Sequence, residues 1–113
     1  MDTQRYDIVM RKGDTFKKKF EVELGTDFTS GYTAQAQFRN HVYDETYILE
    51  LTNTSGIVLN SDGTIEITLT PAQSNLFPEY LSAFDVKITN TNDQTVSTAV
   101  WGNVRMIPSV TRP

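Results

Sequence analysis

The sequence contains no cysteine and only one histidine, His41. Without cysteine, the 113-residue chain has neither disulfides nor thiolate metal sites. His41 lies in a polar segment, and one histidine does not make a histidine-rich metal site. Asp44 and Glu45 follow it closely, but they lack the alternating oxygen ligands of a calcium loop. We therefore predict no metal and no cofactor, and we interpret His41 as a structural or exposed residue.

The chain also lacks a surplus of positive charge, because 14 acids stand against 10 bases and the net charge is −4. Binding of nucleic acid by phosphate neutralisation needs such a surplus, so nucleic acid is not an expected partner. The one basic run, RKGDTFKKKF at 11–20, is interrupted by Asp14 and by two phenylalanines. We interpret it as solvent-facing charge on a strand; the alternative is that Lys17, Lys18 and Lys19 face an acidic neighbour in an assembly.

Long apolar runs and catalytic motifs are missing as well. No apolar stretch has the length of a membrane span, and the opening MDTQRYDIVM lacks the basic and apolar regions of a secretion signal. No nucleophile elbow and no glycine-rich phosphate loop is present, and nothing brings two carboxylates together as a glycosidase requires. We therefore expect no membrane contact and no enzymatic activity.

What the sequence does contain is alternation of apolar and polar residues along most of its length. Turn signals recur at intervals of roughly 8–12 residues, which is typical of an all-β sandwich. The sequence predicts a single domain, 1–113, folded as a two-sheet antiparallel β-sandwich of seven to eight strands, Ig-like or jelly-roll-like, with an extended tail at 108–113. Strands are expected at 6–10, 16–24, 31–39, 48–51, 57–60, 64–69, 83–89 and 95–107.

Three local features refine this prediction. Lys18 interrupts the apolar face of the second expected strand, which places it near the strand's start or at a bulge. Ser61-Asp62-Gly63 is a tight hairpin turn, since an Asp-Gly pair tolerates positive φ. Gly102 indicates a bulge or a bend in the last strand.

The segment TPAQSNLF predicts a short helical turn near 71–76. Thr70 suits the N-cap, and Pro71 suits the first helical position, where its missing N–H costs nothing. Leu76 and Phe77 are expected to hold the turn against the core, and Pro78 ends it. Such a turn carries the chain across one end of a sandwich, from one sheet to the other.

The aromatic residues are the candidates for binding. We interpret Trp101 as a core or interface residue, with a sugar-stacking platform as the alternative. Tyr43, Tyr47 and Tyr80 lie in or beside loops and suit contact with a partner, because tyrosine is enriched at interfaces.

Several segments together resemble a family of small virion proteins of tailed phages, β-sandwich modules of tails and baseplates that include the amino-terminal part of some upper-baseplate proteins. The segments are RKGDTFKKKFEV, GYTAQAQFR, DGTIEITLTPAQSNLF, AFDVKITN and VRMIPSVTRP, in that order along nearly the whole chain. Each motif alone restates strand and turn chemistry. The loop NHVYDETY and the segment PEYLSAF depart from the family pattern, so partner contacts are not carried over.

The resemblance implies a structural protein of the virion, in the tail or baseplate, made in the host cytoplasm and repeated in a symmetric assembly. Its partners would be other virion proteins, and a capsid decoration or neck protein is the first alternative. A module that binds host carbohydrate is the second. The interface candidates combine expected exposure with side chains suited to partner contacts: Lys17, Lys19, Tyr43, Tyr47 and Arg112.

Overall fold

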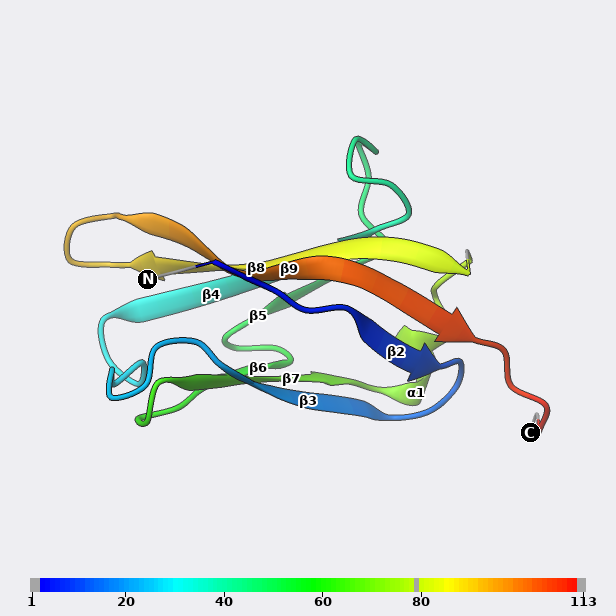
Figure 1. The fold of residues 1–113 in the computed structure, drawn as a ribbon, viewed down its shortest axis with the longest axis horizontal. Helices are drawn as coiled ribbons and strands as arrows, with labels where there is room; N and C mark the ends of the chain where they lie inside the picture. Colours follow the sequence, from blue (N-terminus) through cyan, green and yellow to red (C-terminus); the bar gives the residue numbers. More distant parts are fainter. Residues whose placement is uncertain (1–2, 79, 112–113) are drawn as a thin grey trace.

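The computed structural model describes residues 3–78 and 80–111. It confirms an all-β fold of two sheets with one short helix (Figure 1). The elements in chain order are β1 (Gln4–Arg5), β2 (Ile8–Arg11), β3 (Phe16–Glu21), β4 (Tyr32–Arg39), β5 (Leu49–Thr52), β6 (Ile57–Leu59), β7 (Thr64–Leu69), α1 (Pro71–Ser74), β8 (Leu81–Asn90) and β9 (Val96–Ile107).

The larger sheet has six strands in the order β1-β9-β8-β4-β5, and β2 also pairs with β9. Strands β4, β5, β8 and β9 pair antiparallel, as predicted. The amino-terminal strand differs from the prediction in two ways. It is divided into β1 and β2, and both parts run parallel to β9.

The smaller sheet has the order β3-β7-β6 and faces the larger one (Figure 1). The inward side chains of both sheets form one apolar core, which includes Phe38, Ile65 and Val86, each with no exposed surface. The prediction for 31–39 is confirmed here: Ala34, Ala36 and Phe38 are buried, and the residues between them face outward. Small side chains at 34 and 36 suit the close approach of the second sheet.

Helix α1 forms where the sequence predicts it, with a complete capping box. Thr70 Oγ1 accepts a hydrogen bond from the Gln73 N–H at 3.2 Å, and Gln73 Oε1 accepts one from the Thr70 N–H at 2.9 Å. Phe77 is buried, as expected, but the expectation for Leu76 is wrong, because this side chain is 54% exposed. The chain has left the helix at Asn75, so one side chain of the pair faces the core and the other faces solvent.

Ser74 joins α1 to the turn between β2 and β3. Its buried hydroxyl accepts a hydrogen bond from the Gly13 N–H and donates one to the Asp14 carbonyl, both at 2.9 Å. We expect Ser74→Ala to lower the free energy of unfolding by about 1–3 kcal/mol, because it removes both part-buried hydrogen bonds that join α1 to this turn. Ser61→Ala, in an exposed turn, is the control for denaturant unfolding. Equal stability of the two variants would contradict this role.

The irregularity in β9 lies at a different residue from the one predicted. The register with β8 shifts between Val86 and Lys87, so that Ala99 is the extra residue of the bulge. Gly102 is in regular register opposite Phe84. It is needed for close approach instead, because a Cβ there would lie 2.3 Å from the Tyr6 carbonyl oxygen.

Strand β3 corrects two further details. Lys18 lies near the start of the strand, as one of the two expectations had it, and the regular pairing with β7 excludes a bulge there. Its ammonium group lies 4.7 Å from the centre of the Tyr6 ring, which accounts for a lysine on the inward side. Leu24 was expected on the apolar face, but β3 ends at Glu21, and Leu24 is 70% exposed in the following turn.

Candidate interaction surface

The outward face of the six-stranded sheet gathers most of the chemistry-bearing side chains. The strand register places Trp101 of β9 opposite Asp85 of β8, Asp85 opposite Gln37 of β4, and Gln37 opposite Glu50 of β5. These four side chains therefore form one row across the sheet. An indole ring, two carboxylates and an amide lie side by side on a rigid support.

Part of this row is fixed by hydrogen bonds. Gln35 Nε2 and Gln37 Nε2 both donate to Glu50 Oε2 at 2.6 Å. The bond from Gln37 is the main cause that holds the pKa of Glu50 below its usual value, and the bond from Gln35 adds to it. Arg39 donates to Gln37 Oε1 at 2.7 Å and to the Asp44 carbonyl at 2.9 Å. The network thus ties the sheet to the loop 40–48, which stands out from the sheet in Figure 1.

Two hollows lie along β8, beside this loop. One of about 300 Å³ is lined by residues of β4 and β8, among them Gln37, Arg39 and Asp85. The second, of about 520 Å³, lies between the loop and the start of β8, with Tyr43, Tyr80 and Asn103 in its lining. Val42 and Ala83 line both, so the two hollows adjoin. Asn40 and Ser82 also line the second, and among the described residues neither Asn40 Oδ1 nor Ser82 Oγ has a hydrogen-bond partner.

Exposed aromatic, aliphatic and arginine side chains border the hollows on the β9 side. Arg5 lies over the ring of Trp101 at 5.2 Å and Arg105 over that of Tyr80 at 5.6 Å, measured from the guanidinium carbon to the ring centre. The register sets Arg105 between two half-exposed aliphatic residues, Val9 and Leu81. We call this surface the aromatic–arginine face: Arg5, Val9, Tyr80, Leu81, Trp101 and Arg105.

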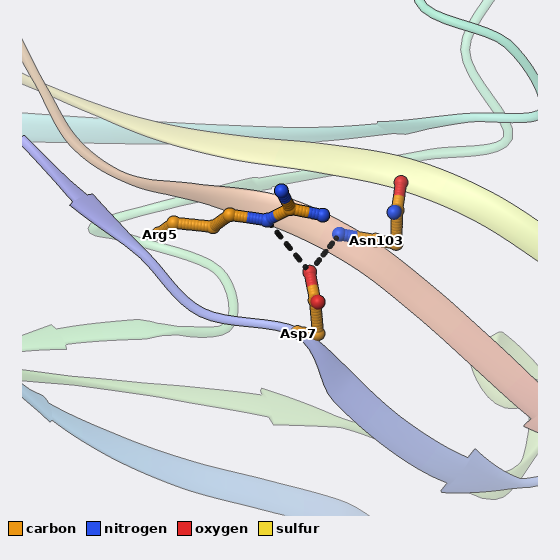
Figure 2. A network of polar contacts seen from close by, with 3 residues as sticks. All are labelled: Arg5, Asp7 and Asn103. Atoms are coloured by element: carbon orange, nitrogen blue, oxygen red, sulfur yellow. Dashed lines mark hydrogen bonds and ion pairs between the residues drawn. The ribbon is translucent and has the colours of Figure 1, made fainter.

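Asp7 attaches the amino-terminal strand beneath this face. The chain is irregular between β1 and β2, and Asp7 Oδ1 takes the place of a backbone acceptor: it accepts the Asn103 N–H at 2.9 Å and Arg5 Nε at 3.4 Å (Figure 2). The hydrogen bond from Asn103 is the main cause that lowers the pKa of Asp7 below 3.8. The contact between Asp7 and Arg5 also holds the Arg5 guanidinium beside Trp101.

We expect Asp7→Asn to destabilise the protein at neutral pH, and the difference from the wild type to shrink in acid. A lowered folded-state pKa contributes stability above the unfolded value of 3.8, and this contribution is lost as the pH falls through the folded value. Thermal unfolding at neutral pH and at about pH 3 measures the difference. Asp85→Asn is the control, since the Asp85 side chain makes no hydrogen bond or ion pair within residues 3–78 and 80–111. A pH-independent difference would contradict this role.

The structure separates the interface candidates that the sequence predicts. Tyr43 is 96% exposed and Tyr47 is 49% exposed, both on the loop beside the hollows. Lys17 and Lys19 are exposed on β3, in the other sheet, and Lys17 lies 3.9 Å from Glu66. Arg112 lies outside the described residues. The four candidates within the described residues therefore do not make one site.

Residues of the aromatic–arginine face were not predicted apart from Tyr80 and Trp101. Of the interpretation of Trp101 as a core or interface residue, the core part is wrong, because the side chain is 45% exposed, and the interface part stays a prediction. The alternation in β9 carried the signal: Val100, Val104 and Met106 face the core, which turns Trp101, Asn103 and Arg105 outward. Arg5 and Val9 join them only through the parallel pairing of the amino-terminal strand.

Comparison with protein-family models and with curated proteins finds no match to this chain. Within the described residues, no group of three or more histidine, cysteine, aspartate or glutamate side chains is placed to hold a metal ion. The described part of the chain also has no helix long and apolar enough to cross a membrane.

Proposed function

We propose that the chain is a structural component of a tailed-phage virion, an adaptor or spacer module in the tail or baseplate that acts through protein–protein contacts. The observation that carries the protein–protein contact role is the aromatic–arginine face. Tryptophan, tyrosine and arginine are the residues most enriched at the energetic centres of protein interfaces. Here they lie together, partly exposed, on one face of a sheet.

The support beneath this face suits a structural role. Its strands are held by the pairing of β8 with β9, from Leu81 to Thr89, and by the shared apolar core below. Interfaces that are preorganised lose less conformational entropy on binding. A face of this kind serves a module that is repeated many times in one particle.

The virion assignment, and the tail or baseplate within it, rests on the sequence resemblance described above. Immunogold electron microscopy of the parent phage, with antibody raised against this chain, tests it. Gold at the distal tail on intact particles, or on disrupted particles alone for a covered adaptor, is the expected result. Gold over the head or neck would favour a capsid decoration or neck protein. No gold on intact or disrupted particles would overturn the virion proposal.

Carbohydrate binding is the second candidate function, and the exposure of Trp101 favours it. An indole ring beside Asp85 and Gln37 offers a stacking surface next to hydrogen-bonding groups. It ranks second because the Arg5 guanidinium lies over that ring. Binding of host glycans to the wild type, its loss in Trp101→Ala, and its retention in Val58→Ala on the other sheet would support it. The absence of glycan binding by the wild type would reject it.

A further inference from the structure

No part of the described structure covers the aromatic–arginine face. The charge of this face is positive, whereas the chain as a whole is negative. Arg5 and Arg105 belong to it, and Arg11 lies exposed beside it at the end of β2. Arg5 is engaged by Asp7, whereas Arg11 and Arg105 form no ion pair within the described residues. A locally basic face on a chain of net charge −4 favours an acidic partner.

The opposite end of the same molecule is acidic. Three connections meet there, formed by residues 22–31, 60–63 and 91–95. The Gly25 N–H donates a hydrogen bond to the Asp62 carbonyl, which joins the first connection to the second. The Thr91 N–H donates one to the Gly31 carbonyl, which joins the third connection to the first. The three connections contain four carboxylates and neither lysine nor arginine, and the last residue of β3 adds one more: Glu21, Glu23, Asp27, Asp62 and Asp93. We call this part of the molecule the hairpin end.

The hairpin end is ordered and carries exposed apolar side chains. Within its turns Thr29 and Thr64 donate hydroxyl hydrogen bonds to Asp27 and Asp62, and the Thr95 N–H donates to Asp93. These bonds lower the pKa of all three carboxyls, so they stay charged in mild acid. Leu24 and Val96 are exposed beside them. Carboxylates around exposed aliphatic groups complement arginines around Val9, Leu81 and the adjoining hollow.

The hairpin end lies at one end of the long axis of the molecule, which measures 45 × 28 × 22 Å. Of the aromatic–arginine face, Arg105 with Val9 and Leu81 lies toward the other end of β9, and Arg5 with Trp101 lies near the middle of that strand. Strand β9 begins at the hairpin end and ends beside Arg11, and its 12 residues span roughly 36 Å at about 3.3 Å per residue (Figure 1). One molecule is therefore too long for its own two surfaces to meet. A second copy of the chain can bring its hairpin end to the aromatic–arginine face of the first.

We propose that copies of this chain associate head to tail, with the hairpin end of one copy docked on the aromatic–arginine face of the next. The inference deepens the proposed function by naming the partner as a second copy. Such a contact joins two different surfaces, so it propagates into a ring or an open filament rather than stopping at a two-fold dimer. The end of the molecule is only 28 × 22 Å across, smaller than the roughly 800 Å² per partner of a standard interface. Each single contact is therefore weak.

Charge-reversal variants in analytical ultracentrifugation test the proposal. Glu21→Lys with Glu23→Lys alters the hairpin end, and Arg11→Glu with Arg105→Glu alters the face. None of these four side chains makes a hydrogen bond or ion pair within the described residues. Lys17→Glu is the control: it reverses an exposed charge on the other sheet and removes only a surface ion pair with Glu66. Circular dichroism establishes that each variant folds.

We expect the wild-type mass to rise with protein concentration and to fall in about 1 M salt, where exposed charges are screened. Each altered pair should be monomeric, and the lysine control should behave as the wild type. An equimolar mixture of the two monomeric variants should associate again, because the intact face of one meets the intact hairpin end of the other, and the two reversed surfaces are also opposite in charge. That outcome is specific to a head-to-tail contact.

A wild type that stays monomeric at every concentration, or a mixture that stays monomeric, would overturn the proposal. So would folded variants that associate as the wild type does. The result is independent of the immunogold experiment. Failure to associate in solution leaves the virion assignment standing, and absence from the particle leaves the head-to-tail contact standing.

Discussion

Gly63→Ala is expected to lower the free energy of unfolding by about 3–5 kcal/mol, a large part of the stability of a domain this size. Gly63 has a φ of +86°, and a Cβ there would lie 1.8 Å from the Glu23 carbonyl oxygen. Its own carbonyl accepts hydrogen bonds from the Val22 and Glu23 N–H groups, each at 3.0 Å. The substitution therefore strains the turn and also separates the hairpin from the end of β3.

Gly25→Ala is the matched control for this prediction. Gly25 has nearly the same φ, +88°, but a Cβ there meets no atom within 4 Å. The left-handed conformation alone costs a side-chain-bearing residue about 1–2 kcal/mol. Denaturant unfolding of both variants separates conformational strain from the clash. Equal losses in the two would show that the contact between Gly63 and Glu23 does not matter.

Phe38→Ala is expected to cost about 3–5 kcal/mol, because it removes a wholly buried ring from the centre of the core. The Phe38 ring stacks on Phe84 at 5.7 Å and meets Phe77 edge to face at 5.6 Å, measured between ring centres. It thus connects the six-stranded sheet to the segment after α1. Phe77 and Phe84 bound the cavity left behind, and their positions limit how far it can collapse.

Tyr43→Ala is the comparison for Phe38→Ala. It also removes an aromatic ring, but from a side chain that is 96% exposed, and we expect a change within about 0.5 kcal/mol. Chemical denaturation measures both changes in the free energy of unfolding, provided that the m value is the same for the variants and the wild type. A loss below about 1 kcal/mol for Phe38→Ala would mean that the core repacks around the missing ring.

The two proposed surfaces depend on the length and pairing of β9. This strand begins at the hairpin end, turns Trp101 and Arg105 outward, and pairs with β1 and β2 along its free edge. Asp7 and Gly102 make that edge pairing close, the first by accepting a backbone N–H and the second by having no side chain. The same residues that attach the amino terminus therefore also place Arg5 on the interaction surface.

The sequence by itself determined the class of the fold and most strand positions. Period-two alternation is a local property: Phe84, Val86 and Ile88 face one way because successive side chains of a strand alternate. The cap of α1 is local for the same reason, since Thr70 and Gln73 satisfy each other within one turn. These features need no information about which strands become neighbours.

The tertiary structure alone decided which outward residues share a surface. The parallel pairing of the amino-terminal strand with β9 brings Arg5 to Trp101 across most of the sequence. Lys17 and Lys19 look equivalent to such residues in the sequence, yet they lie on the other sheet. Strand order and register depend on long-range packing of the whole core, and local alternation is the same for every pairing. The composition of a surface therefore follows from the fold as a whole.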